Sequence, residues 1–173
     1  KQLPRIVLPI RARLMNKILI SSCLLGNPVR YDGGHKQIKH NLIAKWQAEG
    51  RLVSLCPEVA GGLPTPRLPA EIIDTKVVTS AGENVTNAFS KGAELTLTLC
   101  QKHQISIAIL KESSPSCGSQ RIYDGSFANQ LVAGEGLTAR LLKRHGIRVF
   151  NETQLDEVEK LLRLSCNSNL IFG

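Results

Sequence analysis

The pattern that most restricts the fold of this chain is a regular alternation of short apolar runs with longer amphipathic segments. The apolar runs, each of which predicts a strand, cover residues 17–23, 51–56, 105–110 and 147–150. They are continuous rather than alternating in hydrophobicity, which is typical of parallel strands that are buried on both faces. We therefore expect a sheet covered by helices on both sides.

A segment with one apolar face follows each of these runs. The segments that predict helices cover residues 36–50, 86–103, 137–146 and 151–164. The chain has 173 residues, a length that fits one domain. Strands and helices that alternate in this way predict an α/β fold. We expect a single-domain, three-layer αβα sandwich with a mostly parallel, Rossmann-like sheet.

The first 14 residues differ from the rest of the chain. They are basic, and Pro4 and Pro9 interrupt their apolar stretch, so we do not interpret them as a secretory signal. We expect residues 1–14 to be an added or disordered extension and residues 15–173 to form the single domain. No apolar run is long enough to cross a bilayer, and no membrane association is expected.

The charge of the chain says little about a large partner. Its formal net charge is +8, and the N-terminal extension contributes half of that excess through four cationic residues and no acidic ones. No run of Lys and Arg is interleaved with aromatic residues, so nucleic acid is an improbable partner. Attraction of a small anionic ligand remains open.

The number and spacing of the cysteines exclude several classes of protein. There are five, an odd number, at wide spacings and with no C-x-x-C pair. This argues against a disulfide framework, a zinc ribbon and a thioredoxin-type redox motif. A reducing cytoplasm is the expected location.

Three of the cysteines follow predicted strands. Cys23 ends the first strand, Cys56 ends the second, and Cys117 lies in the polar loop "KESSPSCGS" after the third. Loops that follow parallel strands gather at the carboxyl edge of the sheet, where ligands bind, so these three should converge. Cys100 lies on the apolar stripe of a helix and is expected in the core, and no role is expected for Cys166.

Three converging thiolates suit either zinc or an iron–sulfur cluster. A 4Fe-4S cluster normally takes four cysteines, so three would leave one iron without a protein ligand and free to act as a Lewis acid on a substrate. The alternative is that some of these cysteines are simply buried strand ends. The residues alone leave both interpretations open.

Four stretches carry a resemblance to a known family. They are "SSCLLGNPVRYDGGHK", "CPEVAGGLPTPRLPAEI", "GENVTNAFSKGAE" and "KESSPSCGSQRIYDGSF". Together they resemble the thiouracil desulfidase family in its short, stand-alone form, over about residues 17–151. The resemblance implies a 4Fe-4S cluster held by Cys23, Cys56 and Cys117. It also implies a non-redox reaction in which sulfur leaves a thiolated nucleobase or nucleoside.

A mechanism follows as a hypothesis: the substrate sulfur binds the iron that lacks a cysteine, and water attacks the ring carbon. Glu58, two residues after Cys56, is the first choice for acid–base catalysis; the alternative is a loop carboxylate that pairs with an arginine. Ser114 is the second candidate, either as a hydrogen-bond partner of substrate or cluster sulfur or as a turn residue bonded to its own backbone.

Four further residues are candidates for substrate binding. Tyr31 and Asp32 precede a Gly-Gly turn and either face the mouth of the site or only build that turn. Arg67 either anchors its proline-rich loop or contacts a ring carbonyl. Glu112 and Glu71 are weaker acid–base candidates, and we expect Glu112 near the substrate. The histidines are expected on the surface.

Two other functions remain as alternatives. One is a sulfur or iron–sulfur carrier that binds without turnover, and the other is a zinc hydrolase with three thiolates and a water. All-thiolate shells are more typical of structural zinc, which ranks the hydrolase lower. The expected partner is a small thiolated base or nucleoside, and the sequence assigns no oligomeric state.

Overall fold

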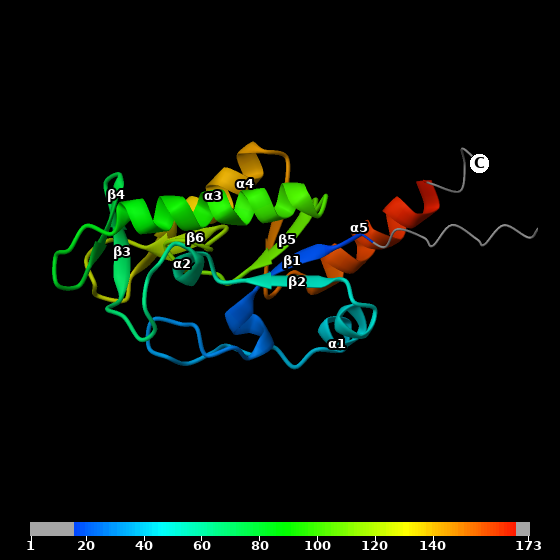
Figure 1. The fold of residues 1–173 in the computed structure, drawn as a ribbon, viewed down its shortest axis with the longest axis horizontal. Coiled ribbons are helices and arrows are strands. Elements are labelled where there is room, and N and C mark those ends of the chain that lie inside the picture. The colour runs from blue at the N-terminus through cyan, green and yellow to red at the C-terminus, as the bar shows by residue number, and fades with distance from the viewer. Residues whose placement is uncertain (1–15, 169–173) are drawn as a thin grey trace, which may run out of the picture.

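A computed structural model describes residues 16–168 of the chain (Figure 1). The extension expected over residues 1–14 and the side chain of Cys166 lie outside what the structure describes. The predictions about them therefore stay predictions.

Four parallel strands form the central sheet. Their order is β2 (Leu52–Leu55), β1 (Ile18–Ser21), β5 (Ile107–Leu110) and β8 (Arg148–Asn151). β2 lies on one side of β1 in the sheet, and the later strands β5 and β8 lie on its other side. The reversal between β1 and β5 is a topological switch point, where a doubly wound sheet opens a crevice at its carboxyl edge. The mixed α/β fold predicted from the sequence is confirmed.

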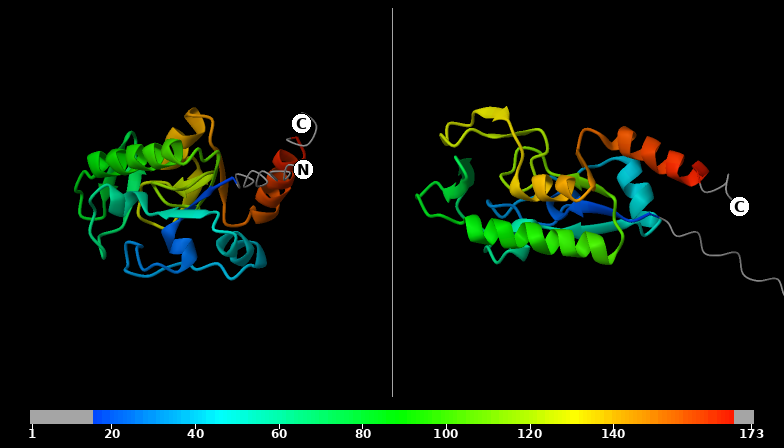
Figure 2. Two further views of the ribbon diagram at one scale, coloured as in Figure 1. Left: turned by 45° about the vertical axis from the view of Figure 1, so that its right-hand side comes forward. Right: turned by 90° about the horizontal axis from the view of Figure 1, so that it is seen from above.

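Helices cover both faces of this sheet (Figures 1 and 2). On one face lie α1 (Asn41–Ala48) and α5 (Leu155–Ser168), and on the other lie α3 (Thr86–Lys102) and α4 (Leu137–Arg144). Side chains alternate along a strand, so β1 feeds both cores. Ile18 and Ile20 pack toward α1 and α5, while Leu19 packs toward α3 and α4.

The core of the second face contains Cys100, as predicted. Its side chain is fully buried in the cluster that also holds Leu19, Ala108 and Leu142. This cysteine therefore has the role of a small apolar core residue.

Two small antiparallel hairpins stand beyond the carboxyl edge of the sheet. The first pairs β3 (Ala70–Ile73) with β4 (Lys76–Thr79). The second pairs β6 (Arg121–Tyr123) with β7 (Leu131–Ala133), in a stretch where the sequence predicted no strand. Strands of three residues are too short to produce a periodic pattern.

The first predicted helix begins later than expected. Residues 36–40 are irregular, and α1 begins at Asn41, where the His40 side chain caps it by accepting a hydrogen bond from Leu42 N. The backbone of residues 36–38 is instead bound to the 3-10 turn η1 (Ser22–Leu25), through Lys36 N to Cys23 O and Ile38 N to Leu24 O. These long-range bonds override the helical periodicity of the segment.

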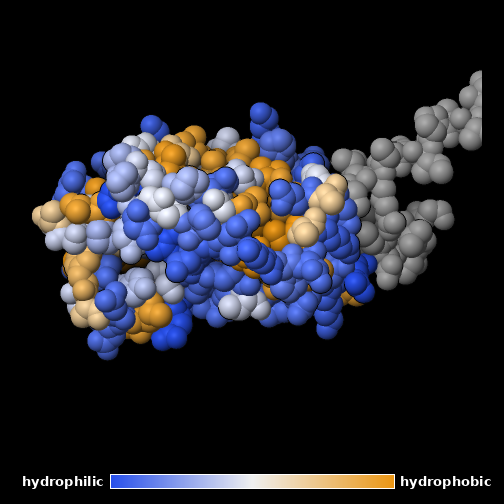
Figure 3. Space-filling view, turned by 90° about the horizontal axis from the view of Figure 1, so that it is seen from below, coloured by the Kyte–Doolittle hydropathy of each residue, from blue (hydrophilic) through white to orange (hydrophobic). Residues whose placement is uncertain are grey.

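The face of the molecule drawn in Figure 3 is largely hydrophilic, with small separate hydrophobic patches. Within residues 16–168, no helix has the length and apolar character needed to cross a membrane.

Candidate active site

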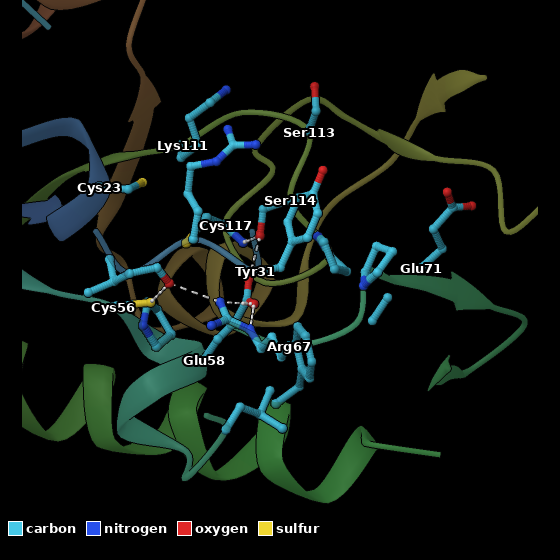
Figure 4. A pocket seen from close by; sticks show the side chains of 18 of the residues that line it. Cys23, Tyr31, Cys56, Glu58, Arg67, Glu71, Lys111, Ser113, Ser114 and Cys117 are labelled. Atoms are coloured by element: carbon cyan, nitrogen blue, oxygen red, sulfur yellow. Dashed lines mark hydrogen bonds and ion pairs between the residues drawn. The ribbon is translucent and has the colours of Figure 1, made fainter. Parts of the chain in front are cut away.

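A cavity of about 680 Å³ opens at the carboxyl edge of the sheet. Its walls come from the loops that follow β1, β2 and β5 and from the first hairpin, as Figure 4 shows. The volume lies within the range of pockets that bind small molecules. The cavity therefore occupies the place where a doubly wound sheet binds its ligand.

Cys23, Cys56 and Cys117 all line this cavity. Cys23 lies in η1 directly after β1, and Cys56 follows β2 and precedes the short helix α2 (Pro57–Ala60). Cys117 lies in the loop after β5 and is 5% exposed. The structure thus brings the sequence-predicted cysteines to one cavity from three separate loops.

Their thiol groups are close enough to influence one another. The pKa of Cys23 is raised to about 11 by burial and then by the charge of Cys56, against the opposing effect of Lys111 and Arg30. Burial also raises the pKa of Cys56 and, more strongly, that of Cys117. Without a cationic centre the three sulfurs are protonated at neutral pH. A bound metal centre would supply the charge that keeps them as thiolates.

Three cysteine sulfurs at one cavity limit the kinds of metal centre that could bind there. Three sulfur donors are soft and select zinc or iron–sulfur centres. Among the residues that the structure describes, no three His, Cys, Asp or Glu side chains are gathered closely enough to hold a metal ion.

Glu58 projects from α2 and is bound to two neighbours. Its Oε2 accepts hydrogen bonds from Arg67 Nε at 2.9 Å and Arg67 Nη2 at 2.5 Å, and its Oε1 accepts one from the Ser114 hydroxyl at 3.2 Å. The two charged side chains are only 16% and 8% exposed. The arginine pairing weighed from the sequence is present, and it holds the carboxylate at the cavity wall.

Ser114 joins Glu58 to the loop that carries Cys117. Its Oγ also accepts hydrogen bonds from Ser116 N at 3.0 Å and Cys117 N at 3.1 Å. The same side chain thus builds its own turn and donates to the carboxylate. The turn role considered for Ser114 is the one that its contacts support, and a hydrogen bond to substrate or cluster sulfur stays a prediction.

Arg67 anchors its loop as well as Glu58. Besides the carboxylate it donates to Pro64 O, Thr65 Oγ1 and Val29 O, at 3.1, 3.3 and 3.2 Å. Its own amide donates to Tyr31 O at 2.7 Å. These bonds support the anchoring role and join the loops after β1 and β2.

Glu112 lines the cavity, but its carboxylate is fully engaged elsewhere. It accepts hydrogen bonds from the amides of Ser119, Gln120 and Arg121, from the Ser119 hydroxyl and from Asn151 Nδ2, at 2.7 to 3.3 Å. Burial alone would raise the pKa of Glu112, but these donors outweigh it and lower the pKa to about 2. A carboxylate held in this way shapes the loop around Cys117, and the structure gives it little freedom to bind substrate.

Tyr31 and Asp32 separate in the structure. Tyr31 lines the mouth of the cavity and is 41% exposed, with the Arg30 guanidinium 5.4 Å from its ring centroid. Asp32 is not one of the cavity-lining residues, and its carboxylate binds Arg30 and Gly34 N within its own turn. The turn role considered for Asp32 is the one its contacts support.

Glu71 is buried in the wall formed by β3. Its Oε2 accepts from Gly125 N at 2.9 Å and Phe127 N at 3.1 Å. The carboxylate therefore ties the first hairpin to the loop after β6. It lies on the opposite side of the cavity from the cysteines in Figure 4.

The sequence reading passed over two cavity residues, Ser21 and Lys111. Ser21 ends β1, and Lys111 follows β5 and forms an ion pair with Glu152. Ser21 is the last residue of the strand that leads to Cys23. Lys111 is the first residue after the strand that leads to Cys117. Residues at the carboxyl ends of parallel strands lie where such a sheet binds its ligand, so the same signal that indicated Cys23 and Cys117 also indicates Ser21 and Lys111.

The fold and the cavity define a doubly wound α/β protein with three cysteines lining a cavity at its switch point. Residues 18–154 match the model of the 2-thiouracil desulfurase family, and the chain belongs to that family. The resemblance drawn from the sequence is therefore confirmed.

Two relatives show how close the similarity is. The solved structure of the [4Fe-4S]-dependent thiouracil desulfidase TudS is 56% identical, with a TM-score of 0.85, over 86% of this chain and 99% of that one. The uncharacterized protein YbbK of Bacillus subtilis (strain 168) is 44% identical over 151 residues, which are 82% of this chain and 99% of YbbK.

Proposed function

We propose that this protein removes sulfur from a thiouracil-type base, free or within a nucleoside, by hydrolysis at a 4Fe-4S cluster held by Cys23, Cys56 and Cys117. The observation that carries the proposal is that these cysteines line one cavity together with the Glu58–Ser114 pair. The family of the chain and the [4Fe-4S]-dependence of its solved relative TudS support it.

When bound, the cluster supplies an iron atom without a protein ligand, and this iron polarises the thiocarbonyl group of the substrate. The chain supplies the remaining functions. Tyr31 offers a flat, half-exposed ring at the mouth, against which a pyrimidine ring can stack. The cavity volume of about 680 Å³ leaves room for a sugar beside the base.

Glu58 is the proposed general base. Arg67 fixes its Oε2, and the Ser114 hydroxyl contacts Oε1, so the carboxylate is already oriented before water arrives. Glu58 takes a proton from the attacking water, and the water oxygen bonds to the ring carbon. Glu58 returns this proton to the sulfur as the C–S bond breaks, and hydrosulfide leaves. The second proton of the water is lost from the new oxygen to solvent as the carbonyl forms. Oxygen replaces sulfur on the ring and no electron is transferred.

One anaerobic experiment tests this proposal. The protein is reconstituted with iron and sulfide, its iron and acid-labile sulfide are quantified, and 2-thiouracil or 2-thiouridine is added. We expect cluster-loaded protein to remove the thiocarbonyl absorbance and to release one sulfide per base, while apo and zinc-loaded protein do neither. Binding of the base without sulfide release would support the carrier alternative, and activity of the zinc form would support the hydrolase.

A further inference from the structure

Ser21, at the end of β1, contacts one of the three cysteines directly. Its Oγ lies 3.5 Å from Cys117 Sγ, and the residue is 2% exposed. The same oxygen accepts a hydrogen bond from Lys111 N at 3.0 Å. Ser21 ends β1 and Lys111 directly follows the neighbouring parallel strand β5 at the switch point, so the pairing of the two strands fixes both groups.

The direction of the Ser21 hydroxyl follows from these two contacts. A hydroxyl has one proton to donate, and the amide of Lys111 points its own proton at the serine oxygen. The serine proton must then point elsewhere, and within residues 16–168 the sulfur of Cys117 is the acceptor that the structure provides. A buried hydroxyl keeps such a partner because the unpaired state is costly.

The other two cavity cysteines lack this contact. Cys56 Sγ lies 3.8 Å from Val29 O, toward which only a thiol proton can point. Cys23 Sγ has no hydrogen-bond partner among the residues that the structure describes. The backbone amides of Val59 and Glu58 act on the Cys56 sulfur. The three sulfurs are therefore not equivalent, and Cys117 is the one that receives a side-chain hydroxyl.

We propose that Ser21 is a positioning residue for the metal centre, whose hydroxyl orients the Cys117 sulfur and withdraws electron density from it. The inference rests on the proposed function, because it takes Cys117 as a cluster ligand. Hydrogen bonds to ligand sulfurs stabilise the more negative, reduced state of an iron–sulfur cluster and so raise its reduction potential. Neighbouring groups of this kind also hold the ligand in the orientation that binds metal.

The test compares Ser21→Ala with Ser22→Ala in anaerobically reconstituted protein. Ser22 is the matched control because it adjoins Ser21, is also buried, lines the same cavity and makes no side-chain hydrogen bond within the described residues. We expect Ser21→Ala to shift the midpoint potential to more negative values and to lose iron in air roughly 10-fold faster. Ser22→Ala should match the wild type in both measurements. Ser21→Thr keeps the hydroxyl and should restore the potential.

Two results would overturn the inference. One is a Ser21→Ala protein whose potential and iron loss equal those of Ser22→Ala. The other is a lower melting temperature of the apo protein with an unchanged potential, which would make Ser21 a packing residue only. Cys117→Ser distinguishes this failure from failure of the proposed function. If that variant keeps its cluster, the ligand assignment is wrong; if it loses the cluster while Ser21→Ala behaves as wild type, only the role of Ser21 is wrong.

Discussion

Cys117 and Cys100 are almost equally buried, but they lie in two regions built on different principles. They are 5% and 0% exposed and belong to the same apolar cluster beneath α3 and α4. Burial raises the pKa of both thiols. The difference lies in their remaining contacts, because Cys117 borders the cavity and receives the Ser21 hydroxyl, whereas Cys100 has apolar neighbours. Burial alone therefore does not distinguish the proposed ligand Cys117 from the core residue Cys100.

The apolar core and the carboxyl edge of the sheet are held together by different interactions. The sheet and its helices are held by continuous apolar packing, which stabilises the domain. The carboxyl edge is held by networks of charged and polar hydrogen bonds, centred on Glu58–Arg67 and on Glu112. Such buried polar groups stabilise little beyond the cost of their desolvation, but they fix side chains in defined positions. The edge is therefore organised for chemistry and depends on the core for its stability.

The largest effect should come from exchanging the cavity cysteines. Cys23→Ser, Cys56→Ser and Cys117→Ser should each lose the cluster and all turnover, because a serine oxygen is a poor substitute for a soft thiolate. Iron and acid-labile sulfide content measures the first effect, and sulfide release from 2-thiouracil measures the second. Cys100→Ser is the matched control and should retain a full cluster. If Cys100→Ser lost as much iron as the cavity variants, the cavity cysteines would not differ from the core cysteine in binding the cluster.

Within the edge, Glu58 should matter for turnover and not for assembly. Glu58→Gln keeps the size of the side chain and removes the base, so we expect turnover to fall by about 10²- to 10⁴-fold with normal iron content. Glu83→Gln is the control, because Glu83 lines the same cavity on an exposed part of the hairpin loop. A variant at position 58 with wild-type turnover would leave the carboxylate with a purely structural role.

In the core, Cys100 should matter for stability and not for chemistry. Cys100→Ser places a hydroxyl in a fully apolar site, which should lower the free energy of unfolding by about 1–3 kcal/mol. Urea unfolding of the apo protein measures this change. Cys100→Ala removes the sulfur without adding a polar group and serves as the comparison. Serine and alanine variants of equal stability would argue that the site is less apolar than its neighbours suggest.

The sequence revealed the part of this architecture that is encoded locally. Continuous apolar runs located the strands of the sheet, and the strand ends then located Cys23, Cys56 and Cys117. It did not reveal what depends on distant partners. Glu112 is a candidate for substrate binding by position alone, but its donors lie 7 to 39 residues away and engage the whole carboxylate. The late start of α1 was missed for the same reason, since residues 36–38 are bound to η1. The β6–β7 hairpin was missed because its strands are too short to give a periodic pattern.

The smallest effect, and the sharpest test of the polar edge, should be the pH dependence that Glu112 contributes. Its pKa is lowered from an ordinary 4.5 to about 2, so the folded carboxylate stays ionised where the unfolded one binds a proton. The resulting stability is fully present above about pH 4.5 and is lost as the pH falls toward 2. Because the group is only part-buried and solvent screens it, we expect about 1–2 kcal/mol at neutral pH.

Glu112→Gln should therefore be less stable than wild type at pH 7, and the difference should shrink between pH 4.5 and pH 2. Urea unfolding of both apo proteins across this range measures it. The pKa of Glu159 is also lowered to about 2, against the effect of its burial, by hydrogen bonds from Lys45, Arg163 and Trp46 between α1 and α5. Glu159 is present in both wild type and Glu112→Gln, so the stability that it loses at acid pH is the same in each. This loss therefore cancels when the two free energies of unfolding are subtracted. A difference that stays constant with pH would show that the Glu112 network holds its loop through shape alone, and the polar edge would then resemble the core more than its charges suggest.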